Sequence, residues 1–292
     1  MAMNKKTPLV PLIALLLLVM SVGYAGSQEV SQVELNPVLD TEKMPYNAVG
    51  MLVGKRTFAS AFVVENQRLV LTTAPLSQNQ TLGEYRWHSE WNAGPSAEED
   101  NATKLLRRVW IFTGQRGYAA HWHKRTTKMR PGFALLESYE DLVPKGHSAT
   151  RSTTPYALME SEETKKQFVG YPQKISKYPT SQSATPLSRP MHAMDLGKSP
   201  LEPLKLYRDQ PFMTLETTSD LNNPDRFSGC EGAPLFAQNK EGNWEVTGIY
   251  SKEIYSVQAG NSTLLFRVLD QETYDALIKP ALPQPLSKKP LF

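Results

Sequence analysis

Cys230 and Glu231 stand side by side between Gly229 and Gly232, so a thiol and a carboxylate are the first groups to consider for chemistry. A reactive thiol needs a basic neighbour or a helix N-terminus that stabilises the thiolate. We therefore expect Cys230 to be a buried, inert thiol. It is also the only cysteine of the chain. No intramolecular disulfide can form, so stability must come from burial of the core.

The five histidines supply imidazoles that could hold a metal or move a proton. His121 and His123 alternate by two, so on a strand they project from the same face, as metal ligands do. Two imidazoles without a third ligand nearby make a poor site, and we expect surface histidines with no metal and no other cofactor. The remaining histidines lie in polar segments predicted to be loops: His88, His147 and His192. Nothing in the sequence places these histidines near Glu231. A histidine that lay beside Glu231 in the folded chain could act as an unconventional base.

Residues 1–25 have the three parts of a secretory signal: a basic start, an apolar stretch and small residues before a cut after Ala25. We expect export to the periplasm or the medium, with no membrane insertion once the signal is removed. An uncleaved membrane anchor is the alternative. Its apolar stretch is shorter than the roughly 20 residues that a bilayer span needs.

Composition and charge limit the possible partners. Hydrophobic residues make up 40% of the 292 residues and charged residues 21%, which is typical of a globular rather than a disordered protein. The formal net charge is +3, and Lys5 and Lys6 of the predicted signal contribute to it. The mature chain is therefore nearly neutral, without the basic excess of a nucleic-acid-binding protein.

Short apolar and β-branched runs separated by turn residues predict an all-β fold. The predicted strands are 48–54, 58–65, 68–73, 105–113, 118–123, 133–137, 156–159, 167–170, 212–217, 234–237, 244–250 and 263–268. Residues 83–103 are predicted to be a surface loop. The prolines between 171 and 207 predict a long connection without a central strand. Asp270 is the expected N-cap of a helix over about 270–279, which the Pro-rich tail 280–292 ends.

Four segments, in order, carry a resemblance to a known family: residues 58–77, 130–137, 228–236 and 246–253. They resemble the chymotrypsin-like serine proteases, most closely the disulfide-poor bacterial branch that includes glutamyl endopeptidases. The resemblance implies a domain over 26–285 built of two six-stranded antiparallel β-barrels. The first barrel would span about 45–145 and the second about 150–268, followed by the C-terminal helix.

The same resemblance implies that the catalytic triad is missing. Pro75 stands where the family has its histidine, Gly132 where it has the aspartate and Glu231 where it has the serine. Acyl transfer on this scaffold needs the nucleophile, the base and its orienting acid. Cys230 replaces the aspartate that, in the family's zymogens, pairs with the newly cut N-terminal amine. We expect a chain that is neither active nor activatable by that route.

The glycines of this loop are retained, so its backbone can still bind an anion. The N–H groups of Gly229 and Glu231 would form such a nest, and the Glu231 carboxylate could fold back into it. A carboxylate exposed to solvent is the alternative, and the sequence leaves both open.

Further candidate binding residues lie around the substrate cleft that the resemblance implies. Asp225 precedes Glu231 by six residues, where trypsins carry their specificity acid, although the adjacent Arg226 could neutralise it. Ser251, Lys252 and Glu253 match the strand that lines the cleft. The family commonly has glycine at the position of Glu253, so a charged side chain there is expected to narrow the site.

These observations predict an exported, non-catalytic protease homologue that binds a protein or peptide, acting as an adaptor, regulator or assembly factor. An extended chain on an exposed strand edge is the expected mode of binding. One alternative is an active hydrolase that uses Cys230 or Glu231 with a distant histidine. Another is a structural component of the cell envelope. The sequence specifies neither the partner nor the oligomeric state.

Overall fold

The structure is a computed structural model of the 292-residue chain. It describes residues 33–53, 58–73, 86–88, 103–112, 132–138, 141–172, 191–204, 212–218, 226–256 and 260–282. The predicted signal 1–25, the predicted strand 118–123 and most of the tail 280–292 lie outside these residues. Among the residues that are described, no helix has the length and apolar character to span a membrane.

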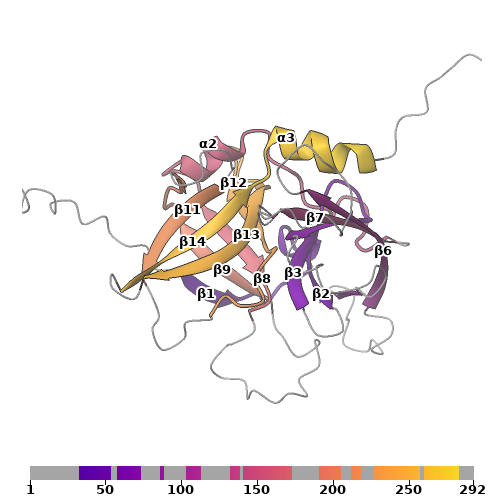
Figure 1. The fold of residues 1–292 in the computed structure, drawn as a ribbon, viewed down its shortest axis with the longest axis horizontal. Helices are drawn as coiled ribbons and strands as arrows, with labels where there is room; N and C mark the ends of the chain where they lie inside the picture. Colours follow the sequence, from indigo (N-terminus) through magenta and orange to yellow (C-terminus); the bar gives the residue numbers. More distant parts are fainter. Residues whose placement is uncertain are drawn as a thin grey trace, which may run out of the picture. The chain divides into compact units, whose positions relative to one another are not determined.

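The first half of the chain forms a closed, six-stranded antiparallel barrel in the order β2-β3-β4-β7-β6-β5 (Figure 1). Its strands are β2 (Val49–Val53), β3 (Phe58–Val63), β4 (Leu69–Thr73), β5 (Arg86–His88), β6 (Thr103–Phe112) and β7 (Phe133–Ser138). Strands β4 and β7 are apolar along most of their length and largely buried. They pair from Leu69–Glu137 to Thr73–Phe133, and this register fixes the position of Gly132.

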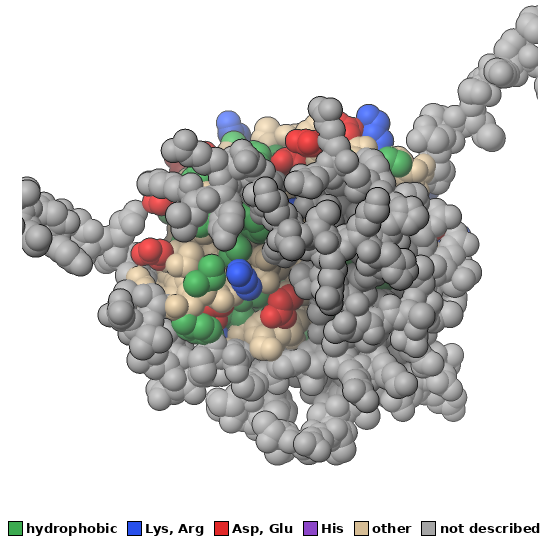
Figure 2. All heavy atoms as spheres, in the orientation of Figure 1, with side chains coloured by type: hydrophobic (Ala, Val, Ile, Leu, Met, Phe, Trp, Pro, Cys, Tyr) green, Lys and Arg blue, Asp and Glu red, His purple; other side chains and the backbone are tan. Residues whose placement is uncertain are grey.

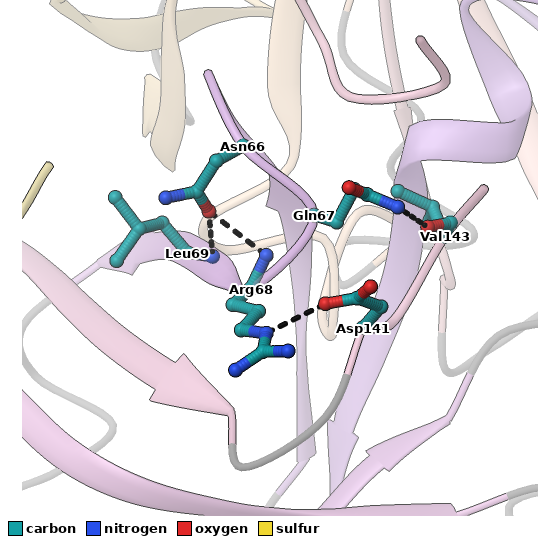
Figure 3. A network of polar contacts seen from close by, with 6 residues as sticks. All are labelled: Asn66, Gln67, Arg68, Leu69, Asp141 and Val143. Atoms are coloured by element: carbon teal, nitrogen blue, oxygen red, sulfur yellow. Dashed lines mark hydrogen bonds and ion pairs between the residues drawn. The ribbon is translucent and has the colours of Figure 1, made fainter. Parts of the chain in front are cut away.

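The turn between β3 and β4 is built by its own polar side chains (Figure 3). Asn66 Oδ1 accepts hydrogen bonds from the N–H groups of Arg68 at 2.8 Å and Leu69 at 2.9 Å, as asparagine does in tight turns. Arg68 also forms an ion pair with Asp141 at 2.6 Å, and Gln67 donates to the carbonyl of Val143. The predicted strands 58–65 and 68–73 are therefore confirmed as a hairpin of β3 and β4, and the segment after β7 is tied to its tip.

The second half forms an eight-stranded antiparallel sheet in the order β1-β9-β8-β12-β13-β14-β11-β10. The bounds are β1 (Glu34–Pro37), β8 (Lys166–Gly170), β9 (His192–Gly197), β10 (Glu202–Pro203), β11 (Phe212–Thr218), β12 (Pro234–Gln238), β13 (Trp244–Ser256) and β14 (Asn261–Val268). The predicted all-β, two-barrel architecture is confirmed. The second sheet holds eight strands rather than six because β1 and β10 add to its two edges.

One apolar core joins the two halves and the C-terminal helix. Phe62 and Leu71 of the barrel belong to the same buried cluster as Val246 and Ile249 of β13 and Ile278 of the helix. The helix begins as α3 (Gln271–Thr273), continues as the π-turn η5 (Tyr274–Ile278) and ends as the 3-10 turn η6 (Lys279–Ala281). Asp270 caps it by accepting from the N–H of Thr273 at 2.8 Å, as predicted.

Three secondary-structure predictions were wrong. Residues 156–159 lie in the helix α2 (Pro155–Glu160), because Pro155 occupies the first helical turn, where proline is favoured. The region 171–207 does contain a central strand, β9, which pairs with β1 and β8. The prolines flank this strand rather than interrupt it. The predicted loop 83–103 contains β5, which is too short to show a two-residue alternation.

Two of the histidines that we predicted in loops lie in strands. His88 ends β5, and His192 begins β9 with its side chain only 6% exposed. His147 does lie outside the strands, where its Nδ1 contacts Asn47 Nδ2 at 3.0 Å. His121 and His123 lie outside the described residues.

Candidate binding site

Antiparallel pairing brings together two of the three segments that the resemblance matches to triad positions. Thr73 at the end of β4 pairs with Phe133 at the start of β7, and Thr73 Oγ1 donates to the carbonyl of Gly132 at 3.5 Å. Pro75 follows two residues later and lies outside the described residues. Gly132 brings no carboxylate to this point, so no described side chain there can orient a base in the way the family's aspartate does.

The third segment is the loop 226–233, which makes tight backbone turns. Gly229 and Gly232 adopt φ values of 90° and 84°, which glycine tolerates best. Cys230 donates its N–H to the carbonyl of Phe227, and the N–H of Ala233 donates to the carbonyl of Cys230. Together these bonds fix the loop on which Glu231 sits.

Ser60 of β3 fastens this loop to the first barrel. Its N–H and its hydroxyl both donate to the carbonyl of Gly229, at 3.1 Å and 2.9 Å. The same hydroxyl accepts from the N–H of Tyr171, just after β8. Thr72 Oγ1 donates to the Ser60 carbonyl at 2.8 Å. A buried hydroxyl of the first barrel therefore holds Gly229 in one orientation.

The Glu231 carboxylate folds back onto its own loop. Its Oε2 accepts from the N–H of Gly229 at 2.8 Å, which is the fold-back conformation considered from the sequence. Burial raises the pKa of Glu231 above its ordinary value, while hydrogen bonds from the N–H groups of Glu231 and Gly229 oppose this rise. The amide nest is therefore formed, and a carboxylate occupies it.

We expect Glu231→Gln to be more stable than the wild type at pH 7, by less than about 1 kcal/mol because the side chain is partly exposed. A carboxyl with a raised folded-state pKa stabilises the fold below its unfolded-state pKa. It loses that contribution as pH rises through the folded-state pKa. Glutamine stays neutral, so the difference should vanish below about pH 4. Urea unfolding of the variant and the wild type at pH 7 and below pH 4 measures this difference in stability.

Glu163→Gln serves as the matched control for this comparison, because Glu163 is an exposed carboxylate. Its stability relative to the wild type should not depend on pH. A Glu231→Gln variant that is less stable than the wild type at pH 7 would contradict the predicted sign.

Cys230 lies in the core of the second sheet with an exposure of 0%. Burial, and secondarily the charge of Glu231, raises the pKa of its thiol well above the ordinary value. The expected inert thiol is therefore what the geometry supports. We predict no labelling by iodoacetamide at pH 7 in the folded state and complete labelling in urea, measured by mass spectrometry. Labelling of the folded protein would show that the thiol is accessible.

Glu253 takes part in a buried polar network rather than projecting from its strand. Its Oε1 accepts from Ser262 Oγ at 2.6 Å, and its Oε2 accepts from the Tyr255 hydroxyl at 2.7 Å. Arg226 Nη2 lies 3.7 Å from Oε1, with side-chain exposures of 10% and 5% for the arginine and the glutamate. Arg226 also donates to the carbonyl of Thr218. This network fills the inner side of β13 next to the loop.

Sequence reasoning missed most of this network. It considered only that Arg226 could neutralise Asp225, which lies outside the described residues, and it did not name Tyr255 or Ser262. One signal was present in the sequence: Glu253 and Tyr255 are two residues apart on one strand, so they share a face. The position of Ser262 follows from the β13–β14 register, in which it pairs with Tyr255.

Strand β13 changes its neighbours along its length. Its first part pairs with β12 up to Ile249, and its later part pairs with β14 through Ser256. Beyond Tyr250 no described strand pairs with its other edge. The pairing of β13 with β14 has a register shift between Tyr250 and Lys252, and Lys252 is exposed. Ser251, Lys252 and Glu253 thus lie together at a strand edge beside the loop, although Glu253 faces inward.

No described histidine hydrogen-bonds to Cys230 or Glu231, since His147 contacts Asn47 and the carboxylate of Glu231 is held by Gly229. Within the described residues, no group of three or more histidine, cysteine or acidic side chains is placed to hold a metal ion. In the described part of the chain, the arrangement offers amide donors, a strand edge and a carboxylate.

Comparison with known proteins was made by sequence and by structure. No protein-family model matches the sequence, and no curated protein matches it. Among solved structures, the chain is similar to one described as the structure of Glu endopeptidase in complex with MPD. The TM-score is 0.55 and the sequence identity 12%, and the match covers 86% of this chain and 98% of that one. At this identity the similarity shows the fold alone.

Proposed function

We propose, starting from the chymotrypsin-like fold that this chain has, that it is a protease homologue that binds an extended protein or peptide segment and does not cleave it. One observation carries the proposal. The residue at the nucleophile position is a glutamate whose carboxylate accepts a hydrogen bond from Gly229, in the place where the fold collects amide donors. A carboxylate held there blocks the approach of a carbonyl oxygen to the same donors.

The environment of the other positions supports the absence of catalysis. Gly132 supplies no acid beside β4. Cys230 is fully buried and kept protonated, so it has no thiolate with which to attack. Loss of all three triad members removes covalent catalysis and proton transfer together.

The edge of β13 beyond Tyr250, with which no described strand pairs, supports binding. Such a strand edge offers N–H and C=O groups to an added strand, and side chains along it give selectivity. Lys252 and Ile254 are exposed there, the latter by 45%. Figure 2 shows hydrophobic, basic and acidic side chains close together on the described surface over the eight-stranded sheet. Such a mixed surface suits a protein or peptide better than a polyanion.

Export is part of the proposal and rests on the predicted signal over residues 1–25. We expect the natural protein to be found in the periplasm or the medium, with its N-terminus at Gly26. Cell fractionation and N-terminal sequencing test this. An N-terminus at Met1 in the membrane fraction would favour the uncleaved anchor instead.

Two measurements test the absence of catalysis. The purified protein should not react with a fluorophosphonate probe, and it should show no turnover of casein or of peptide esters. Inhibitor-sensitive turnover that disappears in Glu231→Ala or Cys230→Ala would show an active hydrolase with an unconventional site.

Binding is tested by a photo-crosslinking amino acid placed at position 252 in the envelope fraction. Lys240, exposed in the turn between β12 and β13, is the matched control position. We expect a discrete crosslinked protein or peptide from position 252 and none from position 240. Equal crosslinking at both positions, or none at position 252, would contradict binding along the β13 edge.

A further inference from the structure

The loop around Glu231 contains two N–H groups that converge on one carboxylate. Glu231 Oε2 accepts from Gly229 at 2.8 Å, and the N–H of Glu231 also bonds to its own side chain. The carbonyl of Gly229 accepts two hydrogen bonds from Ser60, which anchor the peptide plane between Gly229 and Cys230. The N–H of Gly229 therefore projects from an anchored residue, and its bond to Glu231 shows that it can bind a carboxylate.

The nest also lies directly beside the β13 edge. The N–H of Gly232 donates to the carbonyl of Tyr250 at 2.9 Å, and the edge with which no strand of the described part pairs begins at the next residue, Ser251. A strand added along that edge would therefore pass close to the amides that now hold Glu231.

We propose that these amides form a binding site for the C-terminal carboxylate of a peptide, and that Glu231 is the internal ligand that keeps this site closed. The inference rests on the proposed function, since the peptide would lie along the β13 edge. Glu231 is attached to the same loop, so its effective concentration is high and it excludes external carboxylates while it is ionised. Removing its charge or its side chain opens the site.

The groups around Glu231 determine the conditions under which its carboxylate leaves the amide nest. The loop contributes the Cys230 thiol and β13 contributes the Tyr250 phenol and the Glu253 carboxylate, whose charge is already paired with Arg226. The first barrel adds hydroxyl groups where it touches the loop: Ser60, Thr72 and Thr73. None of these described groups is a free cation that would hold the Glu231 charge. Burial raises the pKa of Glu231, so it protonates at a less acidic pH than an exposed glutamate, and the neutral acid is a weaker acceptor.

The test uses the purified protein labelled with ¹⁵N-glycine, so that the Gly229 amide reports on the nest directly. The probe is acetyl-Ala-Ala-Ala with a free carboxylate, compared with the same tripeptide as its C-terminal amide. In Glu231→Ala at pH 7.5 we expect the Gly229 resonance to shift with the free acid, which should bind at least tenfold more tightly than the amide. The wild type and the control Glu163→Ala should bind the free acid at least tenfold more weakly than Glu231→Ala does.

A pH titration of the unmodified wild type adds a readout that needs no variant. The Gly229 amide should shift with a midpoint above 4.5, and this transition should be absent in Glu231→Gln. A Gly229 amide that does not respond to pH would show that Glu231 is not the ligand, and the inference would be overturned.

The two proposals fail in distinguishable ways. Equal binding of the acid and the amide by Glu231→Ala would overturn the carboxylate site while leaving peptide binding at the edge intact. Binding of the free acid at Gly229 without crosslinking from position 252 would support the carboxylate site and contradict the proposed partner at the edge.

Discussion

Gly232→Ala is expected to lower the free energy of unfolding by about 3 kcal/mol or more, the largest effect of any single methyl group in the described loop. A Cβ at this position would lie 2.5 Å from the carbonyl oxygen of Ser60 and closer still to Thr72 Oγ1. Both atoms belong to barrel strands that cannot move aside cheaply. The φ of 84° adds a further cost of about 1 kcal/mol for any L-residue. Urea unfolding monitored by fluorescence measures the loss.

The Gly242→Ala variant separates the cost of steric overlap from the cost of the positive φ. Gly242 has a nearly identical φ of 83°, but a Cβ there would meet nothing within 4 Å. This control variant should lose only the backbone cost, about 1 kcal/mol. Equal losses at the two positions would show that the loop does not press against the first barrel as tightly as its contacts indicate.

Glu253→Met is expected to cost about 3 kcal/mol, because it leaves the guanidinium of Arg226 buried without an opposite charge. Arg226→Met should cost a similar amount, since it leaves the glutamate carboxylate with only the hydroxyls of Ser262 and Tyr255. The double variant should recover most of the loss, because two apolar side chains replace both charges. A double-mutant cycle in urea gives the coupling energy.

The surface pair Asp275–Lys279 is the control for this cycle. The two residues are 3.0 Å apart on the C-terminal helix, with exposures of 43% and 63%. Exposed pairs at this spacing contribute less than about 0.5 kcal/mol. A coupling between Arg226 and Glu253 as small as that of the surface pair would contradict a structural role for the buried network.

Short sequence patterns predicted those elements that are stabilised by contacts between residues close together in the chain. The strands 58–65 and 68–73 were predicted because each is an apolar run, and Asn66 stabilises the turn between them through its own side chain. Asp270 was likewise predicted as a cap. Strand β9 was not predicted, because it is held by long-range pairing to β1 and β8, which no proline count reveals.

The site shows the same division between local and long-range information. The glycines around Glu231 indicated a nest, but the sequence could not decide where the carboxylate points. That depends on Ser60, 169 residues earlier than Gly229, which fixes the orientation of the loop. The contact between Arg226 and Glu253 was missed for a related reason. The sequence neighbour of Arg226 is Asp225, which lies outside the described residues, whereas Glu253 lies on a strand 27 residues away.

The attachment of the loop to Ser60 links the two halves of the fold. The carbonyl of Gly229 is bound from β3 of the barrel, and the N–H of Gly232 is bound from β13 of the second sheet. A movement of one half against the other would therefore strain this loop directly.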